Sequence, residues 1–282
     1  MKILQKIWDE FVYGGHLVAV GDISAIYAFS LILGINIAWT FLLVVYLGVM
    51  SINYFNRYKE FDQDILTSPE RSKELSKYKK FLPLVVVSFF LIMVLVVSQN
   101  ASQKALLFMI FLFLFGILYT VFLKRLTNKI IGFKNLMTTL PYALLVVFLF
   151  IYYDVSFTIG GILILLFYFM RMFLNTALFD IRDIISDKGA GLKTFAIVLG
   201  KDKTLKLLVL LNVLSVAPII YGVYTGVLPL FSIAILFTIL YAFYYLKKIK
   251  SSDINKSFMY NVIIDSEFIF WLPYVLIGGY LL

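Results

Sequence analysis

Apolar stretches long enough to cross a lipid bilayer recur along the whole chain, and they constrain its fold more than any other feature. A membrane-spanning helix needs about 20 predominantly apolar residues. Only 15% of the 282 residues are charged, whereas a soluble domain of this length carries about 25%. The sequence therefore predicts an all-α, polytopic membrane bundle and leaves no segment from which a soluble domain could be built.

We predict about nine transmembrane helices within a single domain that covers residues 1–282. Their expected ranges are 15–34, 36–57, 81–99, 104–123, 134–152, 157–179, 204–224, 228–246 and 259–281. The chain has no cysteine, which excludes disulfides and thiolate metal sites.

Lysine and arginine support this count because they gather in alternate loops. They lie before the first span and in the loops that follow the even-numbered spans, while the other connections carry only Lys104. The positive-inside rule then predicts a multi-pass protein of the cell membrane with its N-terminus and basic loops in the cytoplasm. The rule also accounts for the net charge of +9, so no nucleic-acid partner is needed.

Two acidic clusters follow spans two and six, and both fall on this cytoplasmic side. The first contains Asn56, Glu60 and Asp64, and the second contains Asp180, Asp183 and Asp187. On a continuous helix each set would occupy an arc of about 60–80°, with Asp62 and Arg182 turned away. Ordinary solvated helix ends are the alternative interpretation.

The spacing of the two clusters indicates a parallel internal duplication. Glu60 and Asp183 are 123 residues apart, as are Asp64 and Asp187. Four spans separate the clusters, so both helices run in the same direction. We therefore predict a pseudo-repeat of about 15–123 and 134–246, followed by a ninth helix.

These clusters have the chemistry of a magnesium site. Closely packed carboxylates raise each other's pKa unless a cation lies between them. Hard oxygen ligands without histidine or cysteine favour Mg²⁺, which keeps positions for substrate phosphates. At the mouth of an apolar bundle, this suggests a substrate with a diphosphate head and a lipid tail.

The paired clusters resemble the signatures of the UbiA superfamily of intramembrane prenyltransferases. The first signature is matched by Asn56, Glu60, Asp64, Pro69 and Arg71, and the second by Asp180, Asp183, Asp187, Lys193 and Thr194. "LYTVFLKR" and "GFKNL" resemble the family's loop after span four. The chain departs from the pattern where Arg57 and Glu60 replace aspartates, and where Asn175 and Phe179 replace a common tyrosine and lysine.

The resemblance implies a prenyltransferase that moves an isoprenyl group from a prenyl diphosphate to a lipophilic acceptor in the bilayer. We expect this acceptor to be aromatic. It implies Mg²⁺ bound by Asn56, Glu60, Asp64, Asp180, Asp183 and Asp187. It also implies diphosphate binding by Arg71, Tyr119, Lys124, Lys188 and Lys193. The replacement of the usual aspartate by Arg57 is compatible with binding of a single metal ion, with an altered position of the diphosphate, or with a non-catalytic relative of the family.

Several polar residues lie within the predicted spans: Asp22, Arg171, Asn175, Asp265 and Glu267. Charges inside a bilayer are costly, so these side chains should face the bundle interior. Asp22 and Asn175 are candidate acceptor-site residues. Asp22, Asp265 or Glu267 would orient the acceptor or take its proton, and helix packing is the structural alternative.

Three other functions remain compatible with these features. A cyclase of the same fold would close the allylic cation on itself and need no acceptor. A transporter would also be a duplicated bundle with intramembrane carboxylates, although the clusters lie at helix ends. A non-catalytic lipid-binding relative is the third, motivated by Arg57 and Glu60.

Overall fold

The computed structural model describes residues 2–250 and 256–282, and these residues are almost entirely helical, with no strand among them. The elements are α1 (Lys2–Tyr13), α2 (His16–Leu33), α3 (Trp39–Lys59), α4 (Phe61–Thr67), α5 (Pro69–Ser76), η1 (Lys79–Phe81), α6 (Leu82–Asn100), α7 (Gln103–Val121), η2 (Leu123–Asn128), α8 (Phe133–Tyr152), α9 (Ile159–Arg182), α10 (Ile184–Gly189), α11 (Phe195–Leu199), α12 (Lys201–Leu214), α13 (Val216–Tyr224), η3 (Leu230–Leu236), α14 (Phe237–Lys250), α15 (Lys256–Phe258), η4 (Met259–Ile264), η5 (Asp265–Phe270) and α16 (Trp271–Leu281).

The described residues form nine helical segments long and apolar enough to span a bilayer, which confirms the predicted number. They are His16–Leu33, Trp39–Lys59, Lys79–Asn100, Gln103–Val121, Phe133–Tyr152, Ile159–Arg182, Lys201–Tyr224, Leu230–Lys250 and Lys256–Leu281. The seventh span joins α12 and α13, the eighth joins η3 and α14, and the ninth runs from α15 to α16. The lengths of the apolar stretches predicted these spans well, because the thickness of the bilayer sets the number of apolar residues that a span needs.

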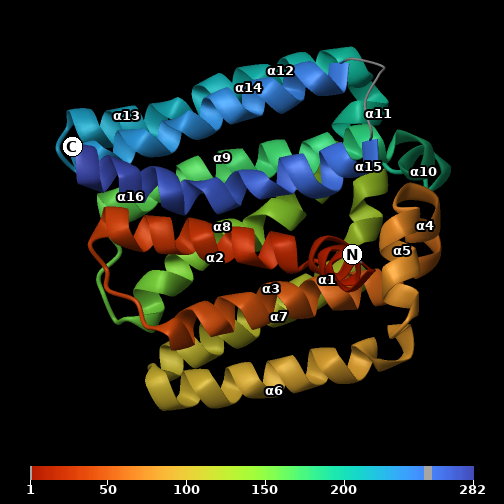
Figure 1. Cartoon of the computed structure of the whole chain (residues 1–282), viewed down its shortest axis with the longest axis horizontal. Helices are drawn as coiled ribbons and strands as arrows, with labels where there is room; N and C mark the ends of the chain where they lie inside the picture. The colour runs from red at the N-terminus through yellow and green to blue at the C-terminus, as the bar shows by residue number, and fades with distance from the viewer. Residues whose placement is uncertain (1, 251–255) are drawn as a thin grey trace.

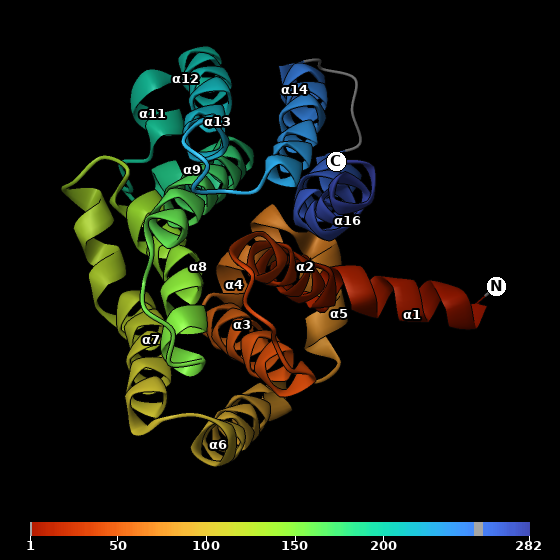
Figure 2. The ribbon, with the colours of Figure 1, turned by 90° about the vertical axis from the view of Figure 1, so that its left-hand side faces the viewer.

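The spanning helices lie roughly alongside one another, and the short helices α4, α5, α10 and α11 gather at one end of the bundle (Figure 1). We call this the polar end. Viewed along the bundle, α2, α3, α8 and α9 surround the centre (Figure 2). Large apolar side chains such as Leu84, Leu91 and Leu240 point outward and are exposed. An outward apolar surface of this kind is what a lipid bilayer would cover.

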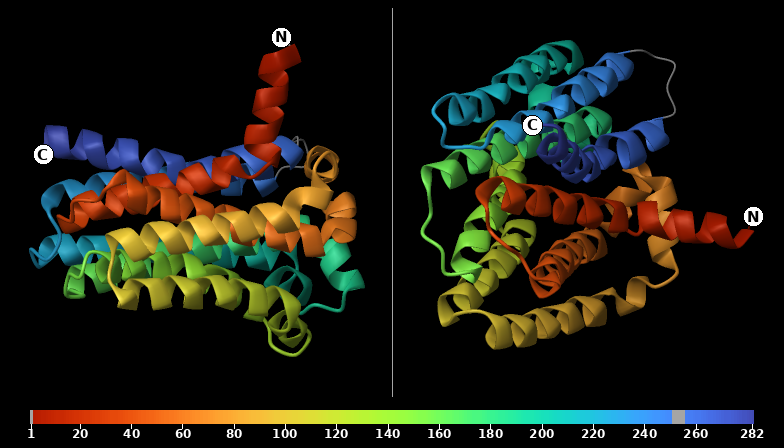
Figure 3. Two further views of the ribbon diagram at one scale, coloured as in Figure 1. Left: turned by 90° about the horizontal axis from the view of Figure 1, so that it is seen from below. Right: turned by 60° about the vertical axis from the view of Figure 1, so that its left-hand side comes forward.

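Helix α1 projects away from the bundle at the polar end (Figure 3). Its apolar side chains Ile3, Leu4, Ile7 and Trp8 are exposed. The chain turns from α1 into α2 at Gly15, whose backbone has φ +99°. That left-handed conformation favours glycine because a side chain would strain it.

Each acidic cluster bends the helix that carries it, so the prediction of one continuous helix through each cluster was wrong. Helix α3 ends before Glu60, which has φ −106° and ψ 14°, and α4 follows. Helix α9 ends before Asp183, which has φ −95° and ψ 10°, and α10 follows. Backbone bonds to the fourth preceding carbonyl continue through both bends, at 2.8 Å for Glu60 N and 3.0 Å for Asp183 N. The bends bring α4 into contact with α10.

A buried ion pair ties α9 to the ninth span, away from the polar end. Arg171 Nε lies 2.9 Å from Glu267 Oε1, and Tyr245 donates to Glu267 Oε2 at 2.6 Å. Asn212 and Thr238 contribute further hydrogen bonds to Arg171 and Glu267. Both carboxylate oxygens of Glu267 accept hydrogen bonds from neighbouring helices. Helix packing therefore accounts for this buried acid without a role in binding the prenyl acceptor.

Candidate active site

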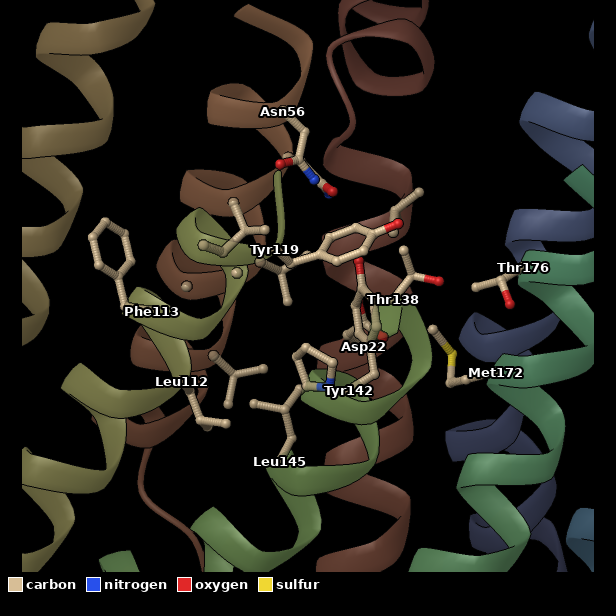
Figure 4. Close-up of a pocket in the computed structure, with 18 of the residues that line it drawn as sticks. Asp22, Asn56, Leu112, Phe113, Tyr119, Thr138, Tyr142, Leu145, Met172 and Thr176 are labelled. Atoms are coloured by element: carbon tan, nitrogen blue, oxygen red, sulfur yellow. The ribbon is translucent and has the colours of Figure 1, made fainter. Parts of the chain in front are cut away.

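A cavity of about 360 Å³ opens among α2, α3, α5, α6, α7, α8, α9 and η5 (Figure 4). Most of its lining is apolar and includes Val44, Met93, Met109, Leu112, Phe113, Leu145, Phe148 and Met172. Its polar lining comprises Asp22, Asn53, Asn56, Arg57, Arg71, Tyr119, Thr138, Tyr142, Asn175, Thr176, Arg182 and Asp265. A cavity divided in this way can hold an amphiphilic molecule with a charged head.

Three arginine side chains line this cavity in the described part of the chain. Arg71 Nη2 donates to Asn261 Oδ1 at 2.9 Å. Arg182 binds Asp183 through two hydrogen bonds of 2.7 and 2.9 Å, whereas its Nη1 is buried and makes none. Burial, together with the charges of Arg57 and Arg182, lowers the pKa of Arg71 to about 9. Guanidinium groups that repel one another in a cavity favour a bound anion.

Arg57 also fastens the start of the chain to this cavity. Its Nη1 donates to the carbonyl oxygens of Tyr13 and Gly14 at 3.2 and 2.9 Å. A Cβ atom at Gly15 would lie 2.7 Å from the same nitrogen, which leaves no room for a side chain. Arg57 is therefore a cationic cavity residue and a structural anchor for α1.

The first acidic cluster lies between the cavity and α4. The Asn56 side chain lines the cavity, and its Oδ1 accepts a hydrogen bond from the Thr120 hydroxyl. Glu60 and Asp64 are partly buried, while Asp62 is exposed as the sequence predicted. Burial raises the pKa of Asp64 even though Arg71 and Arg57 act in the opposite direction.

The second acidic cluster is organised by a lysine from α8. Asp180 is completely buried, and its Oδ2 accepts a hydrogen bond from Asn135 Nδ2 at 2.7 Å. Lys134 Nζ lies 2.9 Å from Asp180 Oδ1 and 3.1 Å from Asp187 Oδ2. Burial raises the pKa of Asp187, and Lys134 only partly offsets that effect.

The structure brings the two clusters to the same end of the bundle without merging them. Of the six residues predicted as metal ligands, Asn56 alone lines the cavity. In the described ranges, no three histidine, cysteine, aspartate or glutamate side chains converge in a ready-made metal site. Tyr119 lies close enough to both clusters for the charges of Glu60 and Asp180 to act on it.

The predicted diphosphate ligands fall into three groups. Arg71 and Tyr119 line the cavity. Lys188 and Lys193 are exposed. The side chain of Lys124 lies outside the described residues.

Sequence reasoning did not predict that three basic residues, Arg57, Arg182 and Lys134, contribute their charge to the site, and it treated Arg57 as a departure from the family pattern. The prediction that Arg182 turns away from the site was wrong, because the cavity lies along the face of α9 that carries Asn175, Phe179 and Arg182, and Asp180 is not part of its lining. The arginines' positions inside the two signatures were the available signal. Lys134 was counted among the loop charges and lies in the motif "GFKNL", but its contact with Asp180 was not predicted.

The intramembrane acids and Asn175 face the interior, as predicted. Asp22 and Asp265 are 1% and 7% exposed, and both line the cavity with Asn175. His16 lies outside that lining, where its Nδ1 contacts the Tyr46 hydroxyl at 2.5 Å.

Comparison with known families gives a decisive match. The model of the UbiA prenyltransferase family matches residues 17–266. The chain belongs to the UbiA prenyltransferase family. This confirms the resemblance inferred from the two signatures, and no curated protein gives a significant match.

Solved structures of UbiA homologues share the fold. A homologue from Archaeoglobus fulgidus bound to GPP and Mg²⁺ is 18% identical, with 95% of this chain and 99% of that chain covered and a TM-score of 0.65. The DMAPP- and Mg²⁺-bound form gives 15% identity, 97% and 99% coverage and a TM-score of 0.62. A digeranylgeranylglyceryl phosphate synthase gives 14% identity, 99% and 97% coverage and a TM-score of 0.57.

The acidic residues of this UbiA family member suit a divalent cation. The donor atoms are hard oxygens, as Mg²⁺ prefers. Burial raises the pKa of Asp64 and of Asp187, and a bound cation would favour the ionised form of both. Because Lys134 and Arg182 already neutralise part of the second cluster, an entering cation would share these carboxylates with them.

Proposed function

We propose that this protein transfers a prenyl group from a prenyl diphosphate to a lipophilic acceptor inside the membrane, with Mg²⁺ as cofactor. The observation that carries the proposal is the divided cavity, with three guanidinium groups at the polar end and an apolar remainder. Family membership supports the reaction class. The homologue structures bound to GPP or DMAPP with Mg²⁺ support the donor and the cofactor.

In this proposal the arginines and acidic clusters hold the donor's head group. Arg57, Arg71 and Arg182 bind diphosphate oxygens, and Tyr119 lies beside them. Asn56, Glu60, Asp64, Asp180, Asp183 and Asp187 would bind Mg²⁺, which neutralises the charge that develops on the leaving diphosphate. Lys124, Lys188 and Lys193 remain predicted contributors.

The apolar part of the cavity would hold the prenyl tail and exclude water. When the allylic C–O bond breaks, its electron pair stays with the diphosphate and a delocalised cation is left. Phe113, Tyr119, Tyr142 and Phe148 line the cavity, and aromatic faces attract cations. A cation shielded from water in this way survives until the acceptor captures it.

We further propose that the polar end faces the cytoplasm in the cell membrane. The support is the concentration of lysine and arginine in the loops at that end, which the positive-inside rule assigns to the cytoplasm. The donor's charged head would then enter from the aqueous side, while its tail stays within the bundle.

Diphosphate release from geranyl diphosphate in the presence of 1,4-dihydroxynaphthalene, by purified protein in nanodiscs, tests the donor half of the proposal. We expect release with Mg²⁺ and none with EDTA. Asp64→Asn should lower the rate at least tenfold, whereas Asp62→Asn, the exposed neighbour in the same helix, should leave it unchanged. No release by the wild-type protein would support the non-catalytic alternative and overturn the proposal.

A further inference from the structure

A deeply buried carboxylate at the wall of the cavity has one oxygen atom without a hydrogen-bond partner among the described residues. Asp22 belongs to α2, and although it is only 1% exposed, it lines the cavity. Its Oδ1 accepts a hydrogen bond of 2.7 Å from the Tyr168 hydroxyl. Its Oδ2 is buried and has no hydrogen-bond partner among the described residues. Buried acceptors are normally satisfied, so this exception calls for a ligand or another explanation.

The buried carboxylate of Glu267 provides an internal comparison. Both of its oxygens accept hydrogen bonds, Oε1 from Arg171 and Oε2 from Tyr245. Helix packing alone thus satisfies an acidic side chain completely in this bundle. The carboxylate of Asp22 accepts a hydrogen bond at only one of its two oxygens, and this distinguishes Asp22 from a residue with a purely structural role.

The depth of Asp22 in the cavity matches the reacting part of a prenyl diphosphate. In Figure 4 it lies between Asn56 at the polar end and Leu145 in the apolar part, beside Tyr142 and Thr138. In the donor, the reacting carbon likewise lies between the diphosphate head and the apolar tail. A head bound at the arginines and a tail bound beside Leu145 would place that carbon near Asp22.

We propose that Asp22 binds the acceptor and takes its proton, an inference that rests on the proposed prenyl transfer. The acceptor's electron pair forms the new bond to the allylic carbon, and the C–O bond breaks with its electron pair leaving on diphosphate. The proton of the acceptor's hydroxyl group passes to Asp22 Oδ2. Tyr168 is then a positioning residue, since its hydrogen bond to Oδ1 directs the other oxygen toward the acceptor.

The charges around Asp22 also select the acceptor class. Oδ2 calls for a hydrogen-bond donor such as a phenol or an alcohol. Asp265 lines the same cavity, close enough for its charge to act on Asp22, and no basic side chain contacts Asp22 in the described structure. Arg57, Arg71 and Arg182 line the same cavity, but in the proposed complex the donor's diphosphate occupies them. A carboxylate on the acceptor would then meet Asp22 and Asp265 and be repelled, so the acceptor is a hydroxyl compound with a neutral head.

A matched panel of naphthalenes tests this inference with geranyl diphosphate as donor. The compounds are 1,4-dihydroxynaphthalene, 1,4-dimethoxynaphthalene and 1,4-dihydroxy-2-naphthoate. We expect the wild-type protein to prenylate the diol at least tenfold faster than the carboxylate, and not to prenylate the dimethyl ether. Asp22→Asn should slow prenylation of the diol by about 100-fold or more, as loss of a general base does.

Binding of geranyl thiolodiphosphate with Mg²⁺ separates this role from a structural one. Asp22→Asn should bind this unreactive donor analogue with wild-type affinity. Loss of donor binding in the variant, or a prenylation rate within threefold of wild type, would overturn the proposal. Diphosphate release by the wild type with prenylation of the carboxylate and not of the diol would overturn the acceptor class.

Failure of the proposed function has a different signature: the wild-type protein would then release no diphosphate, or would release it together with a cyclised or hydrolysed prenyl group. Thermal unfolding of the wild-type protein keeps the inference testable if Asp22→Asn does not fold. With donor analogue bound, the diol should raise the melting temperature and the dimethyl ether should not. Equal shifts would contradict hydrogen bonding to Asp22.

Discussion

Arg71 is the residue whose contacts most directly connect the polar end to the donor. It is held by Asn261 from the ninth span and lies in the cavity with two other guanidinium groups. Its pKa of about 9 still leaves it charged at neutral pH. A charged group held in position before the ligand arrives loses little freedom on binding.

Replacing Arg71 with alanine should weaken binding of geranyl thiolodiphosphate about 10- to 100-fold, as expected for losing hydrogen bonds to a charged group. Isothermal titration calorimetry with Mg²⁺ present measures this change. Lys73→Ala is the matched control, because Lys73 is an exposed cation in the same helix, α5. Equal losses in both variants would mean that net charge, and no specific contact, governs donor binding.

At the scale of elements, the ninth span contributes both to the cavity and to helix packing, because its helical form changes along its length. It passes from the π-helix η4 to the 3₁₀-helix η5. This section directs Asp265 into the cavity and Glu267 into the ion pair with Arg171. Irregular turns inside helices often occur at functional sites.

Arg171→Met should destabilise the protein by about 3–5 kcal/mol, because it leaves Glu267 buried without its partner. Thermal unfolding in detergent measures the loss. The double variant Arg171→Met with Glu267→Leu should recover most of it, since no unpaired charge remains. A double variant as unstable as the single one would show that packing volume, and not charge pairing, holds α9 to the ninth span.

The sequence predicted the spans well and the bends poorly, for a physical reason. Span positions follow from the length of apolar runs, which the bilayer constrains directly. The bends at Glu60 and Asp183 involve one residue each and depend on how α4 packs against α10. No local spacing encodes that contact. Arg182 was misplaced for another reason: the acidic face of α9 was taken as the face toward the cavity, whereas the face of Asn175, Phe179 and Arg182 lines it.

The acidic side chains of the site were partly predictable in the same sense. Their identity and their common end of the bundle followed from spacing and from loop charge. The engagement of Asp180 and Asp187 by Lys134 needed the tertiary structure, because α8 supplies the lysine from 46 positions before Asp180. The matching bends at Glu60 and Asp183 agree with the predicted pseudo-repeat, which remains a prediction.

At the scale of the whole molecule, orientation in the membrane can be measured because the chain has no cysteine. Lys73 in α5 and Thr225 at the end of α13 are both exposed, and α5 and α13 lie toward opposite ends of the bundle (Figure 1). Single cysteines at these two positions would report the two sides. A membrane-impermeant maleimide added to intact cells should label Thr225→Cys alone. Labelling of Lys73→Cys alone would show that the polar end faces outward.

The central claim joins donor and acceptor in one cavity, so the most direct test counts both products of the same reaction. Purified protein receives geranyl diphosphate, Mg²⁺ and 1,4-dihydroxynaphthalene, and mass spectrometry quantifies the geranylated acceptor beside the released diphosphate. We predict that the two products appear in equal amounts. Diphosphate released with a cyclised or hydrolysed prenyl group and no geranylated acceptor would contradict prenyl transfer.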